Sequence, residues 1–143
     1  MFDLSNLPDL EEIKVLKSRY FHYVDSKAWD RLRSEVFVDD CEFELPEASV
    51  SGVDAFLARI SPVLDVATSV HRGHLPEISF ASADRATGRW LMDDEIRWPE
   101  DKPYRRKFTL LRGVGHYYET YVRTAEGWRI KTLRLTRTFV DLS

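Results

Sequence analysis

The chain has 143 residues, of which 43% are hydrophobic and 31% charged, with a net charge of −3 at pH 7. This length and composition predict one globular domain over residues 1–143 with a substantial core, and they exclude a disordered chain. Positive charge is not gathered into a stripe that would bind nucleic acid, and no run of about 18 apolar residues predicts a membrane span.

Two helices are predicted at the start of the chain. The first, over residues 9–24, is indicated by apolar side chains that recur at steps of three and four: Leu10, Ile13, Leu16, Tyr20 and Val24. Pro8 and Asp9 suit its beginning, and Asp25 falls at its end, just before a short join. The second helix is expected from about Lys27 to Val36.

Beyond the second helix the pattern changes from helical periodicity to alternation. The segment CEFEL at residues 41–45 predicts a short strand, and residues 52–64 predict a third helix interrupted at Pro62. Longer strands are predicted at residues 74–81, 87–98, 109–123 and 127–140. Helices followed by such a meander predict an α+β fold, in which helices pack over one face of a strongly curved, mostly antiparallel sheet and enclose a pocket.

The N-terminal residues and the single cysteine both bear on the cellular compartment. The N-terminal residues lack the order of basic, apolar and small residues of a signal peptide. Cys41 has no cysteine partner within the chain and is expected to be a buried packing residue. These features predict a cytoplasmic protein.

His71 and His74, three residues apart in SVHRGHLPEISF, first suggest a metal site or a catalytic base. Residues three apart on a strand point to opposite faces, so the two histidines are not expected to bind one ion. No HExxH helix or paired cysteines exist elsewhere, and no metal is predicted. The GxSxG, GxGxxG and Walker motifs are also absent.

Acid–base chemistry is the remaining possibility for His71. The ordinary pKa of histidine, about 6.5, suits a base at neutral pH. Such a base needs a partner that fixes its tautomer, and Asp25, at the end of a helix that faces the sheet, is placed to provide one. Asp94 lies on the apolar face of its strand, among Trp90 and Met92, where an unpaired carboxylate is costly. A partner for Asp94, or a bulge, is therefore expected.

The sequence resembles the SnoaL-like branch of the nuclear-transport-factor-2-like proteins. The resemblance rests on IKVLKSRYFHYVDSKAWDRL, SVHRGHLPEISF, ATGRWLMDDEI, GHYYETYVRTAEGWRI and RLTR, which together span about residues 10–140. The first blocks look most similar to bile acid 7α-dehydratases; scytalone dehydratases and lindane dehydrochlorinases are more distant. The resemblance implies a cone-shaped fold with an Asp–His dyad at Asp25 and His71.

Further site residues are implied by the same resemblance. Tyr20, Tyr104 and Arg137 fall on or near catalytic positions of the family. Glu44 replaces a pocket tyrosine, which would change the charge of the pocket and the substrate. Independently of the resemblance, Trp90 and His116 are predicted to bind substrate from their places in the aromatic-rich strands.

The implied activity is a lyase that needs no cofactor and expels water from a hydrophobic, ring-containing small molecule. His71 would remove a proton next to, or vinylogous to, a carbonyl. An isomerase or cyclase with the same base, a non-catalytic ligand-binding module, and an accessory subunit of a ring-hydroxylating oxygenase are the alternatives. A homotrimer is expected, with a homodimer as the alternative, through an outer sheet face carrying Leu133 and Leu135.

Overall fold

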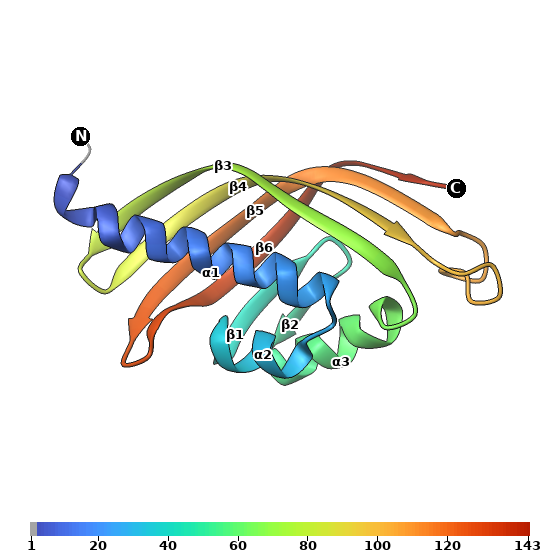
Figure 1. The fold of residues 1–143 in the computed structure, drawn as a ribbon, viewed down its shortest axis with the longest axis horizontal. Helices are drawn as coiled ribbons and strands as arrows, with labels where there is room; N and C mark the ends of the chain where they lie inside the picture. The colour runs from blue at the N-terminus through green and yellow to red at the C-terminus, as the bar shows by residue number, and fades with distance from the viewer. Residues whose placement is uncertain (1–2) are drawn as a thin grey trace.

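The computed structural model describes residues 3–143 and has the predicted α+β architecture (Figure 1). A short 3-10 turn at Leu4–Asn6 precedes helix α1 (Leu7–Asp25), which is followed by α2 (Trp29–Glu35) and later by α3 (Val53–Leu64). In Figure 1 the sheet arches over these helices, which lie on its concave side. None of the described helices is long and apolar enough to span a membrane.

The six strands form one mixed sheet in the order β2-β1-β6-β5-β4-β3. Their bounds are Phe37–Leu45 for β1, Ala48–Ser51 for β2, Thr68–Ser82 for β3, Arg85–Arg97 for β4, Leu110–Thr124 for β5 and Gly127–Leu142 for β6. The last four make the predicted antiparallel meander, and β1 joins it parallel to β6. The β1–β2 hairpin, from the first half of the chain, therefore lies beside β6, the last strand of the chain.

Three local features differ from the sequence prediction. Strand β2 was not predicted, because its four residues are too few to show a period. Strand β3 begins at Thr68, ahead of the predicted residue 74, so His71 lies within it. Helix α3 runs through Pro62 to Leu64, since a proline in the last turn removes only one intrahelical hydrogen bond.

The core fills the space between the helices and the concave face of the sheet. The predicted stripe of α1 is confirmed, with Ile13, Tyr20 and Val24 all no more than 5% exposed. Phe43 of β1 stacks on Phe56 of α3, with ring centroids 3.9 Å apart, which fixes that helix to the sheet. The predicted burial of Cys41 is confirmed as well.

Gly73 allows α1 to approach β3 closely. A Cβ atom at this position would lie 2.6 Å from the ring of Phe21 and 3.3 Å from that of Trp90. A side chain at this position would displace the Phe21 ring and disturb the packing of α1 on β3. The glycine therefore helps to bring the end of α1, with Asp25, against the part of β3 that carries His71.

Candidate active site

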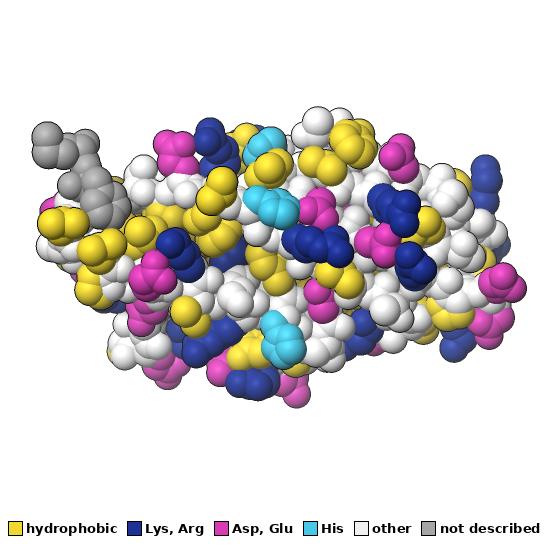
Figure 2. All heavy atoms as spheres, turned by 45° about the horizontal axis from the view of Figure 1, so that its top comes forward, with side chains coloured by type: hydrophobic (Ala, Val, Ile, Leu, Met, Phe, Trp, Pro, Cys, Tyr) yellow, Lys and Arg dark blue, Asp and Glu magenta, His cyan; other side chains and the backbone are white. Residues whose placement is uncertain are grey.

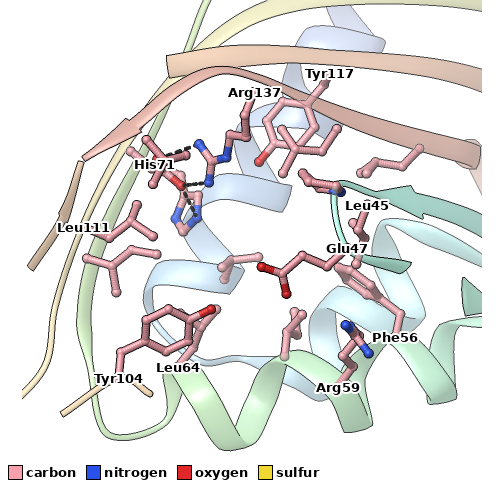
Figure 3. Close-up of a pocket in the computed structure, with 18 of the residues that line it drawn as sticks. Leu45, Glu47, Phe56, Arg59, Leu64, His71, Tyr104, Leu111, Tyr117 and Arg137 are labelled. Atoms are coloured by element: carbon pink, nitrogen blue, oxygen red, sulfur yellow. Dashed lines mark hydrogen bonds and ion pairs between the residues drawn. The ribbon is translucent and has the colours of Figure 1, made fainter. Parts of the chain in front are cut away.

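A cavity of about 420 Å³ lies under the curved sheet (Figure 3). Its walls come mostly from aliphatic and aromatic residues of β1, α3, β4, β5 and β6: Leu45, Phe56, Ile60, Leu64, Ile96, Leu111, Leu133, Leu135, Val140 and Leu142. One polar region, the polar end, is formed by residues of α1 and of four neighbouring strands: Tyr20, His71, Asp94, Tyr117 and Arg137. Three charged residues, Glu47, Arg59 and Arg105, also line the cavity. An apolar chamber with a few convergent polar groups is the usual form of a small-molecule site.

Asp25, the last residue of α1, binds both the side chain and the main chain of His71. The Asp25 carboxylate accepts from the His71 ring at Nδ1 over 2.6 Å and from the His71 main-chain N–H over 2.9 Å. Ser69 Oγ also donates to it, over 2.9 Å. Ser69 and His71 lie on the same face of β3 because residues two apart share a face. The end of the helix and the alternation of the strand therefore create this pair.

The electrostatics of the pair fix the tautomer of His71. Burial opposes ionisation of Asp25, but the hydrogen bonds and charge of His71, with that from Ser69, outweigh it and lower the pKa of this carboxyl. An ionised Asp25 can only accept, so in the neutral form of the His71 ring the single proton is on Nδ1 and the lone pair is on Nε2. The side chain of His71 is 8% exposed and lines the cavity.

Asp94 has the partner that its position on an apolar face demands. Arg137 donates to both its oxygens, over 2.8 and 2.7 Å, and this paired fork satisfies a carboxylate that is only 1% exposed. Burial opposes the charge of Arg137, yet the bonds to Asp94 outweigh it and raise the pKa of the guanidinium. Asp94 Oδ2 also lies 3.7 Å from Nε2 of His71. His71 thus stands between two carboxylates.

The predicted tyrosines occupy different parts of the cavity. Tyr20 of α1 lies at the polar end, with its hydroxyl 3.4 Å from that of Tyr117 on β5. Tyr104, in the loop after β4, stacks on Trp98 with ring centroids 4.7 Å apart and forms part of another wall. In Figure 3 Tyr104 and His71 border the same cavity from different elements.

The three predicted substrate-binding residues lie outside the cavity, which corrects the sequence prediction. Burial alternates along β1: Cys41 and Phe43 are buried, and Glu44, which follows Phe43, is exposed. Its side chain is therefore on the convex side, and Leu45 is the residue that lines the cavity. The charge of Glu44 does not enter the pocket.

Trp90 and His116 are excluded from the cavity for different reasons. Trp90 faces inward but is packed in the core, where its indole N–H donates to Tyr121 over 2.9 Å. His116 precedes the inward-facing Tyr117, so alternation turns it to the convex side. There it lies between Leu91 of β4 and strand β6.

His74 is on the convex face, as strand alternation predicted. Its Nε2 lies 2.5 Å from Asp93, so the outer face carries an Asp–His pair of its own, in which His74 is 44% and Asp93 32% exposed. The predicted separation of His71 from His74 is thereby confirmed. Among residues 3–143 no three His, Cys, Asp or Glu side chains are grouped as potential metal ligands.

Two charged residues of the interior were not singled out from the sequence. Lys17 and Glu119 form an ion pair in which both side chains are 0% exposed. A signal was present: Lys17 lies on the apolar stripe of α1 between Ile13 and Tyr20, and Glu119 continues an inward alternation after Tyr117. Two opposite charges at inward positions of two elements that pack together indicate a buried ion pair.

Comparison with known proteins places this geometry in a family. The family model of the SnoaL-like domain matches residues 5–134. The chain belongs to the SnoaL-like family. The fold and the family predicted from the sequence are thus confirmed, whereas the catalytic use of the site remains a prediction.

Solved structures share this SnoaL-like fold over nearly the whole chain. A candidate scytalone dehydratase from Novosphingobium aromaticivorans is 22% identical with a TM-score of 0.83, covering 95% of this chain and 88% of its own. A LinA-type hexachlorocyclohexane dehydrochlorinase from Novosphingobium barchaimii is 21% identical with a TM-score of 0.80, covering 99% and 94%. At these identities the likeness is one of fold.

Proposed function

We propose that this SnoaL-like protein is a lyase of the dehydratase type that acts on a hydrophobic, ring-containing small molecule without a cofactor. The observation that carries the proposal is His71, whose Nδ1 is bound by Asp25 at 2.6 Å while its ring lines an apolar cavity. A base needs a fixed tautomer and a path to the substrate, and this arrangement provides both.

The proposed reaction begins with a proton transfer to Nε2 of His71. The proton comes from a carbon next to a carbonyl, or vinylogous to it, and its electron pair forms an enolate. The carbon–oxygen bond to the leaving hydroxyl then breaks, and that oxygen takes a proton from the imidazolium to leave as water. Tyr20 and Tyr104 donate to the enolate oxygen or to the leaving group. His71 ends the cycle neutral.

The charges around His71 favour the proton that it accepts. Before the transfer, Asp25, Asp94, Arg137 and neutral His71 carry a net charge of −1; afterwards the four groups are neutral. Arg137 is paired with Asp94 through two hydrogen bonds, so it holds the second carboxylate beside Nε2 and its charge is largely balanced there. Two acids facing the imidazolium stabilise it in a site of low dielectric constant.

The names of two structural neighbours describe reactions similar to the proposed one. A scytalone dehydratase removes water, and a hexachlorocyclohexane dehydrochlorinase removes hydrogen chloride. Both are eliminations that need a proton acceptor. For this chain the link is one of fold alone, and the assignment depends on His71 and its partner.

A panel of bicyclic β-hydroxy ketones in D₂O tests the proposal. Enone formation is followed by ultraviolet absorbance, and deuterium incorporation next to the carbonyl by NMR. We expect turnover with at least one substrate, and a loss of about 10²–10⁴-fold in His71→Ala. His74→Ala is the matched control, because it removes the histidine of the outer Asp–His pair. Equal rates in His71→Ala and the wild type would refute the assignment.

The same assay separates the alternative functions. Deuterium exchange without loss of water indicates an isomerase or cyclase that uses the same base. Ligand binding that survives His71→Ala, with neither exchange nor enone from any substrate, indicates a binding module or an accessory subunit.

We further propose that the protein is a homotrimer that buries the convex face of the sheet, with a homodimer as the alternative. The sequence prediction placed Leu133 and Leu135 on this outer face, but both line the cavity and so do not form the interface. The convex face instead presents Leu91 at 42% and Phe139 at 52% exposure among charged side chains, and Figure 2 shows such a mixed surface. Sedimentation as a monomer at micromolar concentration would contradict both assemblies.

A further inference from the structure

Lys17 and Glu119 form a buried ion pair behind the polar end of the cavity. The Lys17 ammonium donates to Glu119 Oε1, and neither side chain has any exposed surface. Burial lowers the pKa of Lys17 to about 8, against the opposing charge and hydrogen bond of Glu119, so the ammonium keeps its proton at neutral pH. Replacing such a pair with apolar residues is often neutral for stability, so stability alone does not explain its presence.

The ammonium lies on the faces of two pocket tyrosines. Lys17 Nζ is 3.5 Å from the ring centroid of Tyr117 and 3.9 Å from that of Tyr20. Both distances are well within the range of a cation–π contact, which strengthens when it is shielded from water. Lys17 is not among the residues that line the cavity, so it does not itself reach a ligand.

The two hydroxyls have one proton to spare. Their oxygens are 3.4 Å apart, so one proton is used between them, and the hydrogen bonds within residues 3–143 give neither hydroxyl another partner. Burial raises the pKa of both tyrosines, which therefore remain protonated. Both residues line the cavity, and the labelled Tyr117 in Figure 3 directs its hydroxyl into it. The second proton is thus free for an oxygen of the ligand.

We propose that Lys17 and Glu119 are positioning residues that make the Tyr20–Tyr117 pair a stronger hydrogen-bond donor to a negatively charged ligand oxygen. The cation on the rings stabilises negative charge that the phenol oxygens gain when they donate, and its contacts hold both rings in place. Glu119 keeps the ammonium charged in the core. The inference deepens the proposed function, because an enolate oxygen is such an acceptor, but it needs no turnover to be tested.

The test uses 4-nitrophenol as a probe of oxyanion binding. Its ionised form is coloured, so its apparent pKa when bound can be read from the visible spectrum, and 4-nitroanisole of similar shape reports binding without an oxyanion. In Lys17→Met/Glu119→Leu we expect the bound pKa of nitrophenol to rise by about one unit, which is a tenfold weaker preference for the phenolate. Binding of 4-nitroanisole should not change.

Two further variants make the result specific. Lys131→Met/Asp40→Leu removes an exposed lysine–acid pair, with Nζ and Oδ2 2.9 Å apart, and should leave the bound pKa unchanged. Glu119→Gln keeps the cation on the rings, so in mildly acidic buffer its bound pKa should not exceed that of the wild type. This variant also keeps the test open if the first double variant does not fold.

Several results would overturn the inference. One is a folded Lys17→Met/Glu119→Leu protein with an unchanged bound pKa, and another is equal weakening of nitrophenolate and nitroanisole, which indicates packing alone. A bound pKa in Glu119→Gln above that of the wild type is a third. A wild type that prefers neutral nitrophenol is a fourth. Failure of the proposed function is seen separately, as turnover that survives His71→Ala.

Discussion

Replacing Asp25 with asparagine tests the dyad with the smallest change of shape. Asp25 accepts three hydrogen bonds: from Ser69 Oγ, from the main-chain N–H of His71 and from its ring. An amide has one accepting oxygen and one donating nitrogen, so it cannot repeat this pattern. Each of its two orientations fails in a way that can be measured.

In the first orientation the amide oxygen accepts from Ser69 and the ring. The amide nitrogen then faces the main-chain N–H of His71, which loses its acceptor at a cost of about 1–3 kcal/mol. In the second orientation the oxygen accepts from that N–H, and the amide donates to Nδ1. The ring proton must then move to Nε2, and the base is lost.

We therefore expect Asp25→Asn to lose about 10²–10⁴-fold in kcat, to unfold at lower urea concentration, or to show both effects. Turnover of the β-hydroxy ketone gives the first quantity, urea unfolding the second, and ¹⁵N NMR of the His71 ring the tautomer. Asp93→Asn, which alters the exposed pair with His74, is the control and should change neither rate nor the His71 tautomer. Wild-type kcat together with wild-type stability to urea in Asp25→Asn would refute the reasoning.

The remaining predictions concern the acid pair and the pH dependence of stability. A Cβ at Gly113 would lie 2.6 Å from Arg137 Nη1 and 2.9 Å from Asp94 Oδ1, so Gly113→Ala should displace the fork and lower kcat although neither charged residue is replaced; unchanged kcat and an unchanged crystal structure would contradict this. The pKa of Asp25 is lowered in the folded state from an ordinary 3.8, so its ionised form stabilises the fold above that value, and the stabilisation is lost as pH falls through the lower folded pKa. The difference in unfolding free energy between wild type and Asp25→Asn should accordingly shrink in acid, and a difference that grows as pH falls would show the sign to be wrong.

Periodicity predicted the parts of the site that depend on a single element. The stripe of α1 places Tyr20 inside, the end of that helix places Asp25, and alternation on β3 separates His71 from His74. The same rule, applied to CEFEL, places Phe43 inside and its neighbour Glu44 outside, although the resemblance to the family had suggested a pocket role for Glu44. Alternation was the better guide there.

Contacts between elements that are not neighbours could not be predicted in this way. Asp94 on β4 reaches Arg137 on β6 across the intervening strand β5, at Gly113, which has no side chain to obstruct them. An irregularity in the pairing of β5 with β6 follows Arg137, so that Val140 rather than Phe139 lies opposite Gly113. A single extra residue in a strand leaves no trace in periodicity until the partner strand is known.

The donors at the polar end bear on which group the site can expel. A leaving hydroxyl needs a proton as its bond to carbon breaks, whereas a chloride does not, and the neighbours named for scytalone and for hexachlorocyclohexane differ in this respect. Here Tyr20 and Tyr117 have two protons but only one acceptor between them, and burial raises the pKa of both so that they keep those protons. Such a surplus donor offers a hydrogen bond to an oxygen of the ligand, but a phenol that keeps its proton does not itself protonate a leaving hydroxyl. In the proposed reaction the proton that a leaving hydroxyl needs therefore comes from the His71 imidazolium, whereas the tyrosine pair contributes a hydrogen bond to an oxygen of the ligand.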